Sequence, residues 1–223
     1  MIRTTGSVGP SMQSVANRAE LSLATVYNFF GSKGELLYAL LQQMVGRLEL
    51  EMDGLWREEP LQTLLMLAET AANHYAADAD FNRRLLRSVW GSPQIRGNEF
   101  DVGPSIKLYQ KPVKAAISSG QLRREADAEV VARNLVVTFL GSLVLWVHEA
   151  IGNEELRIQV LYAFSLALLG VCTEESRAEL LKANQRFEQQ LSREFFHNRG
   201  ATTKRSRLIR AAKPDPIVVG VDQ

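Results

Sequence analysis

Apolar residues recur every three or four positions along most of this chain, which is the spacing that places them on one face of an α-helix. Alternating runs of apolar and polar residues, which indicate strands, are scarce. The fold class predicted from this pattern is all-α. The expected helices cover residues 11–19, 22–30, 35–56, 60–75, 81–90, 105–119, 127–151, 154–171 and 173–198.

Serine residues mark where the first three helices begin. Ser11 and Ser22 stand at N-cap positions, where a hydroxyl accepts a hydrogen bond from an unpaired amide of the first turn. Ser32 and Glu35 have the spacing of a capping box. Pro112 falls inside the helix expected over 105–119, so we expect a kink or a late start there.

Residues 127–151 and 154–171 form the most apolar part of the chain, with a tight turn at Gly152 and Asn153 between them. A membrane-spanning helix needs about 20 apolar residues. The continuous apolar run over 135–147 is shorter, so we interpret it as a buried helix and expect no membrane partner. Adjacent helices with a short connection form an antiparallel hairpin.

This hairpin carries more apolar surface than one facing stripe needs, and its small residues allow close helix approach. We predict that two copies pack about a two-fold axis as a four-helix bundle, which makes the protein a homodimer. The alternative is that the hairpin is core of a single chain. The expected interface residues are Leu135, Phe139, Ser142, Leu145, Trp146, Leu161, Phe164 and Leu168.

Residues 11–30 have the proportions of a helix-turn-helix, because two short helices are joined by the turn at 20–22. At 3.6 residues per turn, Val26 and Phe30 share one side of the second helix, and Phe29 lies beside them. The small core expected here consists of Val15, Ala16, Ala19, Leu21, Val26, Phe29 and Phe30.

The opposite side of the second helix suits the major groove of double-stranded DNA. Asn28 can form two hydrogen bonds with adenine, and Ala24 can contact a thymine methyl. Thr25, Tyr27 and Lys33 are placed to contact phosphates, which fix the register of a protein on DNA. Amides near Ser22, at the start of the helix, can face a further phosphate.

The run A-E-L-S-L-A-T-V-Y-N-F-F-G-S-K-G-E-L-L, residues 19–37, resembles the DNA-binding signature of the tetracycline-repressor (TetR) family. The resemblance implies that residues 23–30 are the recognition helix and that Thr25, Tyr27 and Lys33 bind the DNA backbone. It also implies an N-terminal helix-turn-helix followed by a larger helical ligand-binding and dimerisation domain. The full set of expected DNA-binding residues is Ser22, Leu23, Ala24, Thr25, Tyr27, Asn28 and Lys33.

Two features depart from the family pattern. Glu20 stands in a turn where glycine is usual, and the positive φ expected there is one that glutamate adopts reluctantly. The family also places a full helix before the one that begins near Ser11. Residues 1–10 resemble only the loop that follows that helix, so we expect the first helix of the DNA-binding domain to be missing.

Aromatic residues are scattered over the middle helices, residues 60–119. For each of them core packing is the simpler interpretation. The alternative is that some line an apolar cavity for a small hydrophobic effector, with His74 as its polar anchor. The expected pocket residues are His74, Tyr75, Phe81, Trp90 and Tyr109.

Charge and cysteine content narrow the possible functions. The chain has 26 Lys and Arg against 25 Asp and Glu, so any argument for nucleic-acid binding must be local. The single cysteine, Cys172, excludes an intrachain disulfide, and we interpret it as a small packed residue. Enzyme motifs such as a P-loop or HExxH are missing, and neither a metal site nor a cofactor is expected.

The sequence therefore predicts three segments: a DNA-binding domain at 1–47, a ligand-binding and dimerisation domain at 48–198, and a basic, disordered tail at 199–223. The leading hypothesis is a cytoplasmic, homodimeric repressor that a small hydrophobic effector releases from a DNA operator. The alternative is a helical ligand-binding or interaction module that has lost DNA binding. An enzyme is the third possibility.

Overall fold

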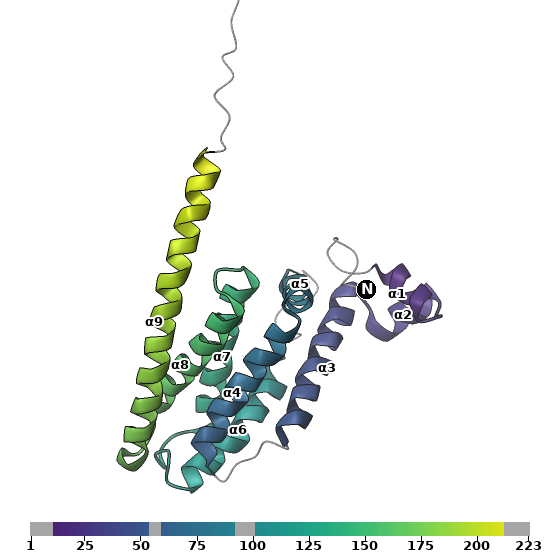
Figure 1. Cartoon of the computed structure of the whole chain (residues 1–223). Coiled ribbons are helices and arrows are strands. Elements are labelled where there is room, and N and C mark those ends of the chain that lie inside the picture. Colours follow the sequence, from purple (N-terminus) through teal and green to yellow (C-terminus); the bar gives the residue numbers. More distant parts are fainter. Residues whose placement is uncertain (1–10, 54–58, 92–100, 212–223) are drawn as a thin grey trace, which may run out of the picture.

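The computed structural model describes residues 11–53, 59–91 and 101–211, and within these ranges the regular elements are all α-helices (Figure 1). The all-α fold class is confirmed. The helices are α1 (Met12–Arg18), α2 (Leu23–Phe30), α3 (Lys33–Asp53), α4 (Pro60–Ala77), α5 (Ala79–Trp90), α6 (Gly103–Ser118), α7 (Ala128–Val147), α8 (Asn153–Leu169) and α9 (Glu174–Ala211).

The three serine caps are confirmed. Ser11 Oγ accepts from the Ser14 amide at 3.1 Å, and Ser22 Oγ accepts from the Thr25 amide at 3.0 Å. Ser32 Oγ accepts from the Glu35 amide at 3.2 Å. Each bond pairs one of the amides that the first turn of a helix leaves without a partner.

The turn between α1 and α2 is a Schellman motif, which requires left-handed backbone at its centre. The Leu21 amide donates to Ala16 O at 3.0 Å and the Glu20 amide to Asn17 O at 3.4 Å, while Glu20 has φ of 57°. The positive φ expected at this position is confirmed. A residue with a Cβ pays for this conformation in stability, because its side chain crowds the following carbonyl.

Two apolar clusters share one helix, α3. The small cluster centres on Met12, Ala16 and Val26, and Leu36 packs against it from α3. The next residue, Leu37, already belongs to the large cluster that fills the body of the molecule. Leu41 and Leu48 of α3 belong to the large cluster too, so α3 packs against both the helix-turn-helix and the body. The ribbon shows α3 running from the helix-turn-helix alongside the other helices (Figure 1).

Helices α4 to α9 form that body. Helix α4 packs against α6 and α8, α7 packs against the same two helices, and α9 lies along α8. Leu64, Trp146 and Phe164 are among the largest fully buried side chains. Burying one large apolar side chain contributes roughly 1.5–3 kcal/mol. Helix α6 continues through Pro112, which is itself buried, so the predicted late start is wrong.

Helix α7 is the one helix of the described residues that is long and apolar enough to cross a membrane. In this fold it is a core helix instead, because Leu135, Phe139 and Trp146 point into the body. The share of its apolar window that is buried is nevertheless only 44%. Much of its apolar surface therefore faces outward.

Two arginines of α5 hold the C-terminal end of α7. Arg83 Nε donates to Trp146 O at 3.0 Å, and its guanidinium lies 4.5 Å from the centre of the Trp146 indole. Arg87 Nε donates to Val147 O at 2.9 Å, and the same side chain pairs with Glu149 at 2.8 Å. These cations satisfy carbonyls that the last turn of a helix leaves unpaired.

Helix α9 runs to Ala211 and extends beyond the other helices (Figure 1). A disordered tail was expected from residue 199, whereas the backbone of residues 199–211 is helical. The physical reason is that this stretch contains no proline and is rich in strong helix formers such as Arg, Lys, Ala and Leu. Residues 212–223 lie outside the described residues, as do residues 1–10.

Replacing Glu20 by glycine should stabilise the helix-turn-helix by about 0.5–1 kcal/mol, because glycine adopts positive φ without a steric penalty. Native-state hydrogen exchange of the α1 and α2 amides measures this change. The matched control is Glu125→Gly, at an exposed glutamate that lacks a positive φ. Equal or faster exchange in Glu20→Gly than in the wild type would contradict this explanation of the turn.

Candidate functional site

Helix α2 presents a polar face that is free of contacts with the rest of the molecule. Ala24 and Asn28 are both exposed, as the wheel predicts. Within the described residues the Asn28 side-chain amide has no hydrogen-bond partner, so its donor and its acceptor both remain available to a base edge.

The flanks of this face also carry groups that can meet phosphates. Tyr27 is 46% exposed. The Ser22 and Thr25 hydroxyls lie 2.7 Å apart at the start of α2. The cap uses the Thr25 amide, and Val26 N bonds to Ser22 O. The Leu23 and Ala24 amides, which have no partner among the described residues, are then the pair that can face an anion.

The electrostatic contribution of this unit is small. Residues 11–33 contain two cations, Arg18 and Lys33, and one anion, Glu20. Salt dependence of DNA binding scales with the number of phosphates neutralised. Two cations per protomer give a slope of log K against log salt of only about −2 for each protomer. Hydrogen bonds and shape must therefore supply much of any DNA affinity here.

The small core differs from the predicted one. Val15, Ala16, Val26 and Phe30 belong to it as expected, and Met12 joins them. Three expected members lie at the surface instead: Ala19, Leu21 and Phe29. Phe29 is 72% exposed, so its assignment to the core needs correction. It stands on the edge of α2 that Thr25 also occupies, and the two helices α1 and α3 do not reach that edge.

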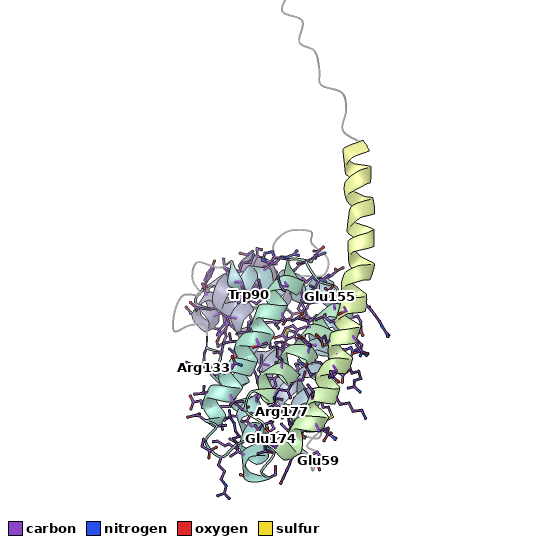
Figure 2. The ribbon with its side chains drawn as sticks, turned by 90° about the vertical axis from the view of Figure 1, so that its left-hand side faces the viewer. Glu59, Trp90, Arg133, Glu155, Glu174 and Arg177 are labelled. Atoms are coloured by element: carbon purple, nitrogen blue, oxygen red, sulfur yellow. The ribbon has the colours of Figure 1, made fainter. Side chains whose placement is uncertain are left out.

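The outward side of α7 carries a stripe of valines seven residues apart, with the exposed polar residues Arg133 and Asn134 between the first two. Val130, Val137 and Val144 are 64%, 60% and 42% exposed, and Gly141 lies between them with open space where a Cβ would be. Leu145, at the margin of this α7 stripe, is 47% exposed. Figure 2 views the face of the molecule that α7, α8 and α9 form and labels Arg133 of α7, which is exposed and lies between Val130 and Val137 along the helix.

Only part of the predicted interface lies on this surface. Leu145 is exposed, but the other seven side chains are buried inside one protomer, at 7% exposure or less. These seven are Leu135, Phe139, Ser142, Trp146, Leu161, Phe164 and Leu168. The α7 stripe, by contrast, is exposed, and so is Leu166 of α8, at 51%. The heptad-like spacing of Val130, Val137 and Val144 was the sequence signal for this stripe.

A cavity of about 50 Å³ lies inside the body, between α3, α4, α6 and α7. Its walls are mainly aliphatic and aromatic, and two of the predicted pocket residues, Tyr75 and Tyr109, line it. The space corresponds to about one or two water molecules. Any larger occupant has to move at least one of the four helices.

The two tyrosine hydroxyls at this cavity are chemically unusual. Tyr75 and Tyr109 are 8% and 4% exposed, and neither hydroxyl has a hydrogen-bond partner among the described residues. Burial raises the pKa of Tyr75 to about 12. Burial, with a smaller contribution from Tyr75, also raises the pKa of Tyr109. Both phenols are therefore neutral donors near neutral pH. Neither hydroxyl is among the inaccessible side-chain atoms that lack a partner, so both face space that a water molecule or a ligand atom can reach.

The other predicted pocket residues lie elsewhere. Phe81 and Trp90 are half-buried against the main core, and His74 is half-buried with its ring edge-on to Tyr75 at 6.4 Å between ring centres. None of the three lines the cavity. The aromatic residues of the middle helices correctly indicated the region of the cavity. Val45 and Leu48 of α3, which form another wall, could not be distinguished in the sequence from ordinary core residues.

Comparison with known proteins places this architecture. No family model and no curated protein sequence matches the chain. Among solved structures, a TetR-family transcriptional regulator from Marinobacter aquaeolei VT8 superposes with a TM-score of 0.54 at 14% identity, over 80% of this chain and 89% of the other. A gamma-butyrolactone receptor (ArpA-like protein) gives 0.52 at 18% identity, over 82% and 87%.

A third solved structure is described as the molecular basis for control of antibiotic production by bacterial hormones. It gives a TM-score of 0.56 at 21% identity, over 74% of this chain and 88% of the other. At these identities the likeness concerns the fold. The chain has the all-helical architecture of TetR-family regulators, which confirms the fold that the resemblance of residues 19–37 implies.

Proposed function

We propose that the protein is a DNA-binding transcriptional regulator that acts as a homodimer in the cytoplasm. The observation that carries this proposal is the exposed face of α2, where Ala24 and Asn28 stand free at the surface of a capped helix of a helix-turn-helix. The side chains on this face do not contribute to packing within the chain. The length of α2 and its isolation from the body suit insertion in a major groove.

The proposed regulation is release from a DNA operator by a small hydrophobic effector. The cavity supports it because Val45 and Leu48, in its wall, belong to α3. Leu36, near the other end of α3, packs on the core of the helix-turn-helix. An effector that enlarges the cavity has to displace one of its walls. Displacement of α3 would move α2 relative to the body.

The chemistry of the cavity defines the effector further. The two phenol hydroxyls are donors without acceptors, and the walls carry no charged side chain. A neutral molecule with an apolar body and one acceptor oxygen, such as a carbonyl, would satisfy both. One of the structural neighbours is a gamma-butyrolactone receptor. A lactone meets this description, so lactones are the first compounds to test.

The proposed dimer uses the α7 stripe and Leu166 of α8. Two hairpins that meet there would form a four-helix bundle. A two-fold interface doubles every contact. It would also give the regulator two α2 helices, as a palindromic operator requires.

Selection of bound fragments from random double-stranded DNA tests whether the protein recognises particular bases. Asn28→Ala should relax the preference at one base pair of each half-site, at a cost of about 1–3 kcal/mol, because the bonds to the base edge are lost. Lys33→Ala should weaken selected and random DNA alike and flatten the salt dependence by about 0.9 for each protomer. The control is Gln43→Ala, which removes an exposed amide of α3 outside the helix-turn-helix.

Equal losses of Asn28→Ala on selected and random DNA would contradict the assignment of Asn28. Failure of the wild-type chain to enrich any sequence would favour the alternative, a helical ligand-binding or interaction module without DNA binding.

Sedimentation of Val137→Arg tests the dimer. The substitution should raise the dissociation constant by at least about a hundredfold, because each interface would then bury two unpaired charges. Leu145→Arg, at the margin of the stripe, should act in the same direction. Leu50→Arg is the control, since Leu50 is 75% exposed on α3, away from α7. A monomeric wild type at micromolar concentration, or an unaffected Val137→Arg dimer, would argue against this interface.

Thermal unfolding with and without acyl lactones tests the effector site. The double variant Tyr75→Phe/Tyr109→Phe should unfold at about the same temperature as the wild type when empty, because neither hydroxyl has a hydrogen-bond partner among the described residues to lose. Its lactone affinity should fall about fivefold or more through loss of the carbonyl's hydrogen bonds. Tyr162→Phe, outside the cavity, is the control. Unchanged lactone affinity in the double variant would show that the two phenols do not bind the effector.

A further inference from the structure

A second and larger hollow lies on the opposite side of α4 from the tyrosine cavity. It is a groove of about 420 Å³ between α4, α8 and α9, and it shares no lining residue with the cavity. Its apolar floor consists of Leu65, Met66, Leu161 and Phe187. Leu161 and Phe187 are buried and the other two are half-buried. The volume lies within the range of small-molecule sites in proteins.

The polar groups on two sides of the groove are already paired. Gln62 Nε2 donates to Glu179 Oε1 at 3.2 Å, which ties α4 to α9. Arg157 contacts Glu69 Oε1 at 2.6 Å and also bonds to Glu154. The charge of Arg157 is therefore matched by two carboxylates. These groups shape the walls of the groove but offer a ligand little.

Two groups of α9 remain available. The Oε1 atom of Gln190 is buried in the groove wall and has no hydrogen-bond partner, which is a costly state for an amide oxygen. The guanidinium of Arg186 lies 4.8 Å from the centre of the Phe187 ring, and it has no carboxylate partner among the described residues. Gln190 follows Arg186 by one helical turn, so both groups serve the same end of the groove.

We propose that this groove is a binding site for a small amphipathic acid that carries a hydroxyl or amide donor near its carboxylate. The carboxylate binds Arg186, and the apolar chain covers Leu65, Met66 and Phe187. The donor binds Gln190 Oε1 after the Gln190 side chain turns toward the groove, because this atom is inaccessible in the empty groove. A single negative charge fits, because Arg186 is the one cation of the lining that lacks a carboxylate partner in the described part of the chain. Arg186 is exposed at the surface, so a charged head group keeps part of its hydration there.

Titration calorimetry of the full chain with three compounds tests the site: 3-hydroxydecanoate, decanoate and 1-decanol, each below its micelle-forming concentration. The first should bind at one molecule per chain. Decanoate should bind about five- to tenfold more weakly, because it lacks the donor for Gln190. Decanol should also bind more weakly than 3-hydroxydecanoate, because its hydroxyl can donate to Gln190 but it lacks the charge that Arg186 recognises.

Variants assign the binding to this groove. Gln190→Leu should remove the difference between 3-hydroxydecanoate and decanoate, and Arg186→Gln should remove the difference between 3-hydroxydecanoate and decanol. Lys182→Gln, one turn before Arg186 and exposed, is the charge-matched control and should change neither. The double variant Tyr75→Phe/Tyr109→Phe should bind all three compounds as the wild type does, which separates this groove from the proposed effector cavity.

The proposal is overturned if the wild type binds none of the three compounds saturably. It is also overturned if the three bind alike, or if Arg186→Gln and Lys182→Gln lose affinity equally. Arg186 lies at the surface, so Arg186→Gln carries the test by itself if Gln190→Leu loses its fold.

Discussion

Helix α7 has more apolar surface than one protomer can bury, and the architecture of the molecule follows from where that surface goes. One side of the helix, with Leu135 and Trp146, is enclosed by α6 and α8. The other side, the stripe from Val130 to Val144, remains exposed. Apolar surface in water costs roughly 25 cal/mol for each Å². Covering the stripe would recover this free energy, and in the proposed dimer a second copy of the same stripe covers it.

The position of α7 also explains how the proposed regulator could work. The tyrosine cavity has walls on α3 and α7. It therefore lies between α3, which follows the proposed DNA-binding helix α2, and α7, which is proposed to join two protomers. Arg83 and Arg87 fasten α5 to the C-terminal end of α7, and α5 also packs against α3. Motion of α3 would therefore disturb its packing against α5 as well as the wall of the cavity. An effector would act against a defined set of contacts.

The sequence predicted what depends on neighbours along the chain. Ser11, Ser22 and Ser32 cap the helices they precede, and Glu20 has the positive φ that its place in the turn requires. Features that depend on packing between distant segments were harder to predict from the sequence. Phe29 lies on the flank of α2 next to Val26, but no other helix arrives there to cover it. Periodicity locates the apolar faces of a helix; it does not say which of them a partner helix will bury.

The same limit applies to α7 and to the cavity. Both sides of α7 are apolar, so its sequence could not tell which side the core would take, and seven of the eight expected interface residues belong to the core. Tyr75 and Tyr109 meet because α4 and α6 are neighbours in space, 34 positions apart in sequence (109 − 75). The unpaired state of their hydroxyls becomes visible only in three dimensions.

The most direct test of the account is the distance between the two α2 helices of a protein–DNA complex, measured by pulsed electron resonance. A spin label at Ala19→Cys, in a chain with Cys172→Ser, would report it, since Ala19 is exposed next to α2 and has no assigned DNA contact, and Cys172 is buried. The account predicts a single distance near one turn of B-DNA, about 34–36 Å, on the DNA that the chain selects. The absence of any label-to-label signal would mean that one α2 helix binds alone, and it would contradict the α7 dimer as the basis of DNA recognition.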